Sequence, residues 1–180
     1  MTKIIAIIDT NVIFSALYKP DSNPGLILLL AILDRIELVA PLAVRREIRE
    51  KLVEKLRFSD QEALYIISAL PIRWVEDEII KDLIPRALKI IADRDDAPIV
   101  ALQILTGYSI ITGDNELLEN KNIHAYSPRD FLETLIKNNI VNKKEIEELK
   151  KEIKLIEALV KMSTEYISTR QTDFRGNVLL

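Results

Sequence analysis

Two aspartates that lie far apart in the chain each follow a short apolar segment with the composition of a buried strand. Asp9 comes directly after residues 3–8, and Asp114 follows residues 109–112 and a glycine. Because parallel strands end at one edge of their sheet, we expect both carboxylates at that edge, where open α/β sheets bind ligands. Like charges held close together resist ionising, and a bound divalent cation is the commonest reason for such a pair.

Two further acidic residues are expected at the same edge from the order of the elements. Glu47 lies early in a helix predicted to follow a second strand, and Asp96 begins the helix predicted for residues 97–106. A helix that runs antiparallel to the strands starts at their carboxyl edge. Oxygen donors on a chain with no cysteine and one histidine suit Mg²⁺ or Mn²⁺ better than zinc.

Each of these acids also has an ordinary structural interpretation. Asp9 could accept hydrogen bonds from turn amides, Asp96 and Asp114 could cap helices, and Glu47 could be a solvated helix residue. The metal-site prediction therefore depends on the convergence of all four. Polar neighbours of the strand-end aspartates are expected to hydrogen-bond either the carboxylates or their own turns. These neighbours are Thr10, Asn11, Thr112 and Asn115.

Strand-like and helix-like segments alternate along the first 138 residues. This alternation predicts an α/β fold, with a central parallel sheet between two helical layers. The expected strands are residues 3–8, 36–40, 71–76, 109–112 and 123–126. The expected helices are residues 25–34, 41–56, 59–70, 78–91 (with Pro85 inside it or between two pieces), 97–106, a short one after Asp114, and 127–137.

Asn138 and Asn139 mark a predicted boundary between a domain of residues 1–138 and a C-terminal helix and tail, residues 139–180. Apolar residues recur there at spacings of three and four, as in a coiled coil. They are Ile146, Leu149, Ile153, Ile156 and Val160. This helix either packs on its own domain or joins copies of the chain into a homodimer or higher oligomer. The apolar end of residues 173–180 suggests that the tail docks on another surface, of this chain or of a partner.

Composition limits the classes of function. A formal net charge of −3 argues against a strongly basic nucleic-acid-binding coat, although a local basic patch is compatible with it. No apolar stretch is long enough to span a bilayer, and no targeting segment is recognisable, so we expect no membrane association and a cytoplasmic location.

Four segments of the chain resemble motifs of the PIN-domain nucleases, and they occur along the chain in the order that the family has. Residues 8–17 resemble the opening motif of the family, and residues 111–118 resemble its fourth motif. Residues 46–52 are similar to the helical glutamate motif, and residues 95–102 to the third motif. The resemblance covers roughly residues 3–135 and implies the PIN-like three-layer α/β/α fold, followed here by a C-terminal helical extension.

The resemblance also implies an activity, hydrolysis of phosphodiester bonds, most often in RNA. By this resemblance one or two Mg²⁺ or Mn²⁺ ions would be held by Asp9, Glu47, Asp96 and Asp114. Many small prokaryotic PIN proteins are toxins held by an antitoxin protein, whereas others process RNA without one. The sequence does not choose between the two.

Two alternatives remain beside the nuclease. A non-catalytic PIN-like scaffold would bind RNA or a protein without cutting it, and the intact set of four acids argues against that. A haloacid-dehalogenase-like phosphatase also places an aspartate after its first strand. That family expects a second acid two positions later, where this chain has Asn11.

Basic residues near the predicted site are candidates for holding the substrate. Arg46 and Arg49 share a predicted helix with Glu47, and Arg94 lies two positions before Asp96. They either bind backbone phosphates or belong to a solvated face on which acidic residues are interleaved. No aromatic run suited to base stacking is present, so the sequence indicates no base preference.

Overall fold

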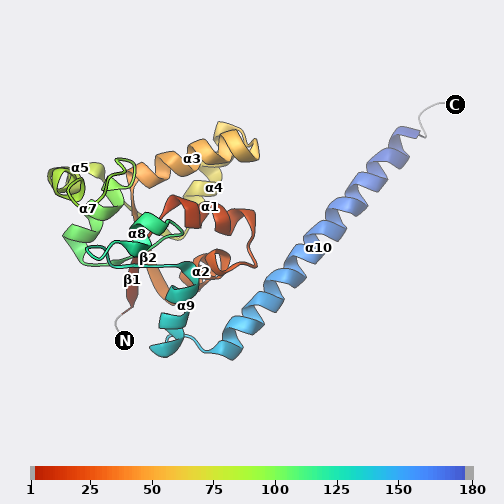
Figure 1. The fold of residues 1–180 in the computed structure, drawn as a ribbon. Helices are drawn as coiled ribbons and strands as arrows, with labels where there is room; N and C mark the ends of the chain where they lie inside the picture. Colours follow the sequence, from red (N-terminus) through yellow and green to blue (C-terminus); the bar gives the residue numbers. More distant parts are fainter. Residues whose placement is uncertain (1–2, 177–180) are drawn as a thin grey trace. The chain divides into compact units, whose positions relative to one another are not determined.

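Within the described residues, five parallel strands form one sheet in the order β3-β2-β1-β4-β5 (Figure 1). The strands are β1 (Ile4–Ile8), β2 (Ile36–Pro41), β3 (Ile72–Val75), β4 (Ser109–Ile111) and β5 (Ala125–Tyr126). The computed structural model describes the backbone of residues 3–176 and the side chains of residues 3–161. Isoleucine-rich strands suit this position, because β-branched side chains pack well on a pleated surface that is buried on both faces.

Helices cover both faces of the sheet, which confirms the predicted three-layer arrangement. One layer contains α1 (Thr10–Tyr18), α2 (Asn23–Ile32), α3 (Leu42–Leu56), α4 (Asp60–Ala69) and α9 (Pro128–Lys137). The other contains α5 (Asp77–Ile80), the 3₁₀ helix η1 (Lys81–Leu83), α6 (Ile84–Ala87) and α7 (Ala97–Thr106). In Figure 1 the labels of α5 and α7 lie to the left of the strands and those of α1 and α2 to the right. The short helix α8 (Asn115–Glu119) packs beside β5.

Two predicted helix boundaries are confirmed by their capping contacts. Ser59 and Glu62 form a capping box at the start of α4. Gly107 ends α7 with φ of +72°, a left-handed conformation that glycine adopts without steric cost.

Two stretches differ from the sequence-based expectation. Residues 10–18, for which no helix was predicted, form α1 directly behind Asp9. One helix, or two pieces divided at Pro85, was expected over residues 78–91, but the structure has three short pieces, α5, η1 and α6, which end at Ala87. Pro85 lies in the first turn of α6, where its missing N–H leaves no hydrogen bond unmade.

The chain divides into two compact units, residues 1–141 and residues 142–180. The second unit contains one long helix, α10 (Lys143–Gly176). The apolar residues that recur along this helix at spacings of three and four form its apolar seam. Two of them, Ile156 and Val160, are 60% and 57% exposed. Lys144–Glu148 and Lys150–Glu147 ion pairs lie along the helix. None of the helices in the described part of the chain is both long enough and apolar enough to cross a bilayer.

Candidate active site

Strand β1 delivers Asp9 to the carboxyl edge of the sheet at the point where the strand order reverses. From β1 the chain proceeds to β2 and β3 on one side, then returns to form β4 and β5 on the other. Ligands of open α/β sheets bind at such a switch point, in the crevice outside the strand ends. Ile8 pairs with Ile111, and the Asp9 amide donates to the Ile111 carbonyl at 3.1 Å. Asp9 and Thr112 therefore follow two adjacent, paired strand ends.

The carboxylate of Asp9 is almost fully buried, with 4% of the residue exposed. Its Oδ2 accepts hydrogen bonds from Thr112 Oγ1 at 2.6 Å and from Asn11 Nδ2 at 2.5 Å, as expected of these neighbours. Burial raises the pKa of Asp9 and the charge of Glu47 adds to this rise, while the Thr112 hydroxyl and Lys51 oppose it. Asp9 holds the N-cap position of α1 but its side chain makes no capping bond there. The side chain is instead engaged by Thr112 and Asn11.

A second set of hydrogen bonds ties the two strand ends together. Asn11 Oδ1 accepts from the Gly113 amide at 3.0 Å, and Thr112 Oγ1 accepts from the Asp114 amide at 2.9 Å. Asp114 caps α8, because its Oδ1 accepts from the Glu116 amide at 2.7 Å. Capping uses only one of its two oxygens, so the cap and a ligand role for the other oxygen are compatible.

Glu47 reaches the same edge from α3. Its Oε2 accepts from Thr10 Oγ1 at 2.6 Å, and its Oε1 pairs with Lys51 Nζ at 2.7 Å. Lys51 belongs to the basic helix around Glu47 that was a candidate for binding backbone phosphates, but its ion pair with Glu47 was not predicted. The spacing of four residues, one helical turn, is the sequence signal for that pair.

Asp96 gives the clearest evidence that the predicted acidic residues lie near one another. It stands at the N-cap of α7, yet its side chain makes no capping bond. Burial, and after it the negative charges of its acidic neighbours, together raise the pKa of Asp96 to about 7. These neighbours are Asp9, Asp93, Asp114 and Glu47. All four predicted ligands are therefore close enough to interact electrostatically.

The four carboxylates suit a hard divalent cation in their chemistry. They form a partly buried cluster of acids with raised pKa values at Asp9 and Asp96, and a cation among them would relieve the repulsion. Among the residues that the structure describes, however, no three such groups already stand together closely enough to hold an ion. Asp9 and Glu47 are instead engaged by the hydroxyls of Thr112 and Thr10. Binding would therefore require these side chains to turn toward the ion.

Asn115 and three other polar residues lie away from this cluster or at its margin. Asn115 is exposed in α8 and takes no part in the hydrogen bonds around Asp9 described above. Asp93 and Asp95 are exposed turn residues, and Asp93 Oδ1 accepts from the Asp95 amide at 2.8 Å. His124 is exposed beside Ser109, at the opposite end of β4.

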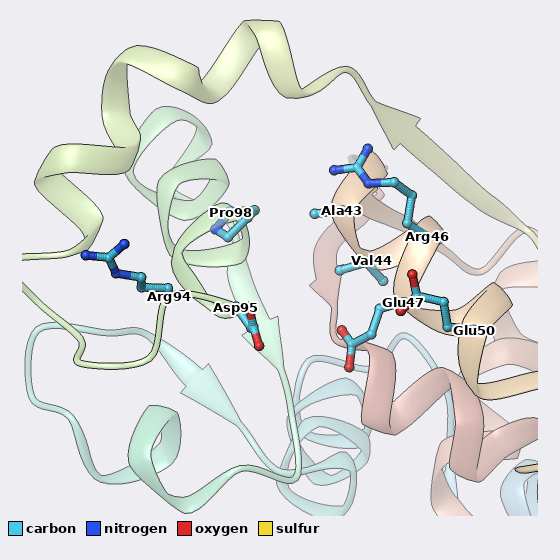
Figure 2. A pocket seen from close by; sticks show the side chains of 8 residues that line it. All are labelled: Ala43, Val44, Arg46, Glu47, Glu50, Arg94, Asp95 and Pro98. Atoms are coloured by element: carbon cyan, nitrogen blue, oxygen red, sulfur yellow. The ribbon is translucent and has the colours of Figure 1, made fainter. Parts of the chain in front are cut away.

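A pocket of about 330 Å³ opens beside Glu47, between α3 and the start of α7 (Figure 2). Arg46 and Arg94 line it, together with Ala43, Val44, Glu47, Glu50, Asp95 and Pro98. Arg46 Nη2 is held by Asp77 Oδ2 at 2.5 Å. Arg49, the third predicted substrate-binding residue, pairs with Asp60 at 3.0 Å and does not line this pocket.

Comparison with known proteins identifies the family. A family model described as PIN domain matches residues 7–126, which is more than half of the chain, and the chain therefore belongs to the PIN domain family. This confirms the resemblance inferred from the four motifs. A search of curated proteins found no match.

Two solved structures share the fold at low sequence identity. One is a chain of VapBC2 from Rickettsia felis, crystallised with a DNA fragment from their promoter. It is 18% identical with a TM-score of 0.51, over 69% of this chain and 98% of that one. The other belongs to a toxin–antitoxin complex from Klebsiella pneumoniae. It is 15% identical with a TM-score of 0.52, over 68% of this chain and 97% of that one.

Proposed function

We propose that this PIN-domain protein is a metal-dependent nuclease that hydrolyses phosphodiester bonds in single-stranded RNA. The observation that carries the proposal is the gathering of four acids at the switch point of the sheet, recorded by the raised pKa of Asp96. Perturbed pKa values of this kind are concentrated at functional sites, because a cluster of like charges costs stability. Family membership supports the same activity.

Asp9, Glu47, Asp96 and Asp114 would hold Mg²⁺ or Mn²⁺. When bound, such an ion supplies a water of lowered pKa and neutralises charge on the reacting phosphate. Thr112 and Asn11 fix the position of Asp9 Oδ2, and Thr10 fixes Glu47 Oε2. Lys51 offsets part of the negative charge of the cluster.

A regulatory partner is part of the proposal. One of the similar structures is a toxin–antitoxin complex, and we propose that this chain is likewise a toxin restrained by an antitoxin protein. Expression of the chain alone in a bacterial host should then arrest growth, and Asp9→Asn should relieve the arrest. Growth arrest that persists in Asp9→Asn would separate toxicity from this site.

We also propose that α10 joins copies of the chain through its exposed apolar seam. Sedimentation should show a dimer or higher oligomer for the full chain. Replacing Ile156 and Val160 by aspartate should give a monomer with an unchanged thermal midpoint for residues 1–141. A wild-type monomer at high micromolar concentration would contradict this part of the proposal.

The activity is tested by incubating the protein with single-stranded RNA and DNA of mixed sequence in Mn²⁺ or Mg²⁺. We expect RNA cleavage by the wild type and none by Asp9→Asn, Asp114→Asn. A matched control, Asp34→Asn, Asp82→Asn, removes the same formal charge at exposed positions and should cleave normally. Cleavage that is unaffected by the first pair would refute the assignment of the site.

A non-catalytic scaffold is the second candidate, because no three acids are arranged as a ready-made ion site in the described residues. A scaffold would bind RNA without cleaving it and without any dependence on Mn²⁺. The cleavage experiment separates the two functions when it is run beside an RNA-binding measurement on the same preparation.

A further inference from the structure

The stretch of α10 from residue 155 to residue 160 presents an apolar stripe that is wider than a coiled-coil seam. Leu155, Ile156, Leu159 and Val160 are each between 56% and 61% exposed, whereas Ile146 near the helix start is buried. With about 100° between successive residues of a helix, these four side chains spread over about 140° of its surface. A two-stranded coiled coil needs only the narrower stripe at two positions of each heptad. The wider stripe suits a groove that contacts the helix from more than one side.

A groove of this kind lies on the first compact unit, where α3 packs against both α1 and α4 (Figure 1). Residues of all three helices and of the turn between α3 and α4 line a hollow of about 360 Å³. The lining is apolar or aromatic and consists of Leu17, Tyr18, Leu52, Leu56, Phe58 and Ile66. Among the described residues no charged side chain lines this hollow, so it lacks the cations that a nucleic-acid backbone requires. Its chemistry suits apolar side chains.

One end of the groove is basic, and one end of the stripe is acidic. Lys55 Nζ lies 5.8 Å from the centroid of the Phe14 ring, which stacks on Tyr18 of the lining. Arg57 directly precedes the lining residue Phe58, and neither cation forms an ion pair within the residues that the structure describes. On α10 the exposed Glu152 lies three and four residues before the first two members of the stripe, and therefore on the same helix face. Stripe and groove thus complement each other in charge as well as in apolar character.

We infer that the apolar stripe of α10 from one copy of the chain docks in the groove between α1, α3 and α4 of a second copy. The inference rests on the proposed self-association through α10, and it names the surface that receives the helix. Each copy carries one stripe and one groove, so two reciprocal contacts close a two-fold dimer. Both apolar faces are then removed from water, which is the driving force for the association.

Disulfide cross-linking tests this contact directly, because the chain has no cysteine of its own. Full-length Tyr18→Cys and Leu159→Cys chains are mixed and oxidised mildly. We expect a disulfide-linked dimer in the mixture and little in either chain alone. Tyr65→Cys is the matched control, because Tyr65 is 77% exposed on α4 but does not line the groove, and it should not cross-link to Leu159→Cys. No cross-link in the mixture, or one that forms as readily in Leu159→Cys alone, would overturn the inference.

Sedimentation of the full chain measures what the groove contributes to the dimer. Tyr18 is 72% exposed, so Tyr18→Asp should leave the thermal midpoint unchanged while it raises the dimer dissociation constant about 10-fold or more, as for a tyrosine at the centre of an interface. Tyr65→Asp should change neither value. Glu152→Lys should weaken the dimer by up to about 5-fold at low salt, the scale of one exposed ion pair, and adding Lys55→Glu should restore it. An unchanged dissociation constant in Tyr18→Asp would overturn the inference.

The outcomes separate this inference from the proposal on which it rests. A dimer that is lost in Ile156→Asp, Val160→Asp but kept in Tyr18→Asp refutes the groove and leaves self-association through α10 standing. A disulfide within a single chain of Tyr18→Cys, Leu159→Cys, with no dimer in sedimentation, refutes the second copy as the occupant of the groove. A wild-type monomer at high micromolar concentration refutes the self-association itself. The cleavage assay tests the nuclease independently of all three.

Discussion

The two edges of the parallel sheet differ in how their charged side chains are paired and buried. At the amino edge, charges are exposed and matched, as in the ion pair between Lys3 and Asp34. At the carboxyl edge, Asp9 is buried and Asp96 is partly buried, and burial together with the surrounding acids raises the pKa of Asp96 to about 7. The Lys3–Asp34 pair is already matched, whereas the acids around Asp96 repel one another, and a cation bound among them would release that electrostatic energy.

This difference indicates that the carboxyl edge of the sheet is less stable than it could be because it carries the proposed metal site. Like charges in a partly buried site destabilise the metal-free fold, whereas exposed ion pairs contribute little either way. Replacement of an acidic residue at the carboxyl edge should therefore lower activity and raise the stability of the metal-free fold. Substitutions at the amino edge should change neither by much.

The largest effect is expected for Asp96→Asn. The substitution removes a proposed ligand, so RNA cleavage measured as kcat/KM should fall by about 10²- to 10³-fold, the scale of losing one preorganised electrostatic group. It also relieves repulsion, so the thermal midpoint in EDTA should rise by about 2–4 °C for each kcal/mol relieved. A fall in both quantities would show that Asp96 is a structural residue.

A second prediction concerns Thr112, which is fully buried and bonded to both Asp9 and Asp114. Thr112→Val keeps the shape and removes the hydroxyl, so unfolding free energy from urea melts should fall by about 1–3 kcal/mol. Affinity for Mn²⁺ should fall by about 10- to 100-fold, as for other groups that orient a ligand. Unchanged affinity would mean that the hydroxyl positions only the backbone.

Much of this site could be predicted from the sequence, for specific reasons. Isoleucine-rich strands followed by Asp9 and Asp114 are visible as local patterns, and parallel topology then places both at one edge. Burial and hydrogen bonding of Asp9 by Thr112 followed from the same pairing of strand ends.

The features of the fold and site that were not predicted depend on contacts between helices, which local sequence patterns do not encode. Helix α1 lacks a capping bond and contains β-branched residues, so its sequence carries weak helix signals. The bond from Thr10 to Glu47 joins α1 to α3 across the structure. The separation of Arg46 from Arg49 into different surroundings likewise depends on their partners Asp77 and Asp60.

The dependence of stability on pH sharpens the comparison of the two edges. The carboxyl of Asp96 ionises near pH 3.8 when unfolded and near pH 7 when folded. Between these values the folded state binds more protons, so the unfolding free energy contributed by Asp96 falls as pH rises from 3.8 to about 7 and then levels. Urea melts in EDTA should show this slope in the wild type relative to Asp96→Asn. An identical pH profile for both proteins would contradict the raised pKa.

The smallest effect is expected at the amino edge. Lys3→Ala breaks an exposed ion pair, so the unfolding free energy should change by no more than about 1 kcal/mol and RNA cleavage should be unchanged. Thermal melts and the same cleavage assay check both values. A loss of activity here would mean that the charge asymmetry between the edges is not what matters.

Calorimetric titration with Mn²⁺ at pH 8, where Asp96 is ionised, tests the central claim most directly. The wild type and the Asp34→Asn, Asp82→Asn control should bind the ion, and saturation at about 100 times Kd should add about 2.7 kcal/mol to the unfolding free energy. Asp9→Asn, Asp114→Asn should show no binding at millimolar Mn²⁺. Absence of binding by the wild type, or equal binding by the double variant, would contradict a cation site at the carboxyl edge of the sheet.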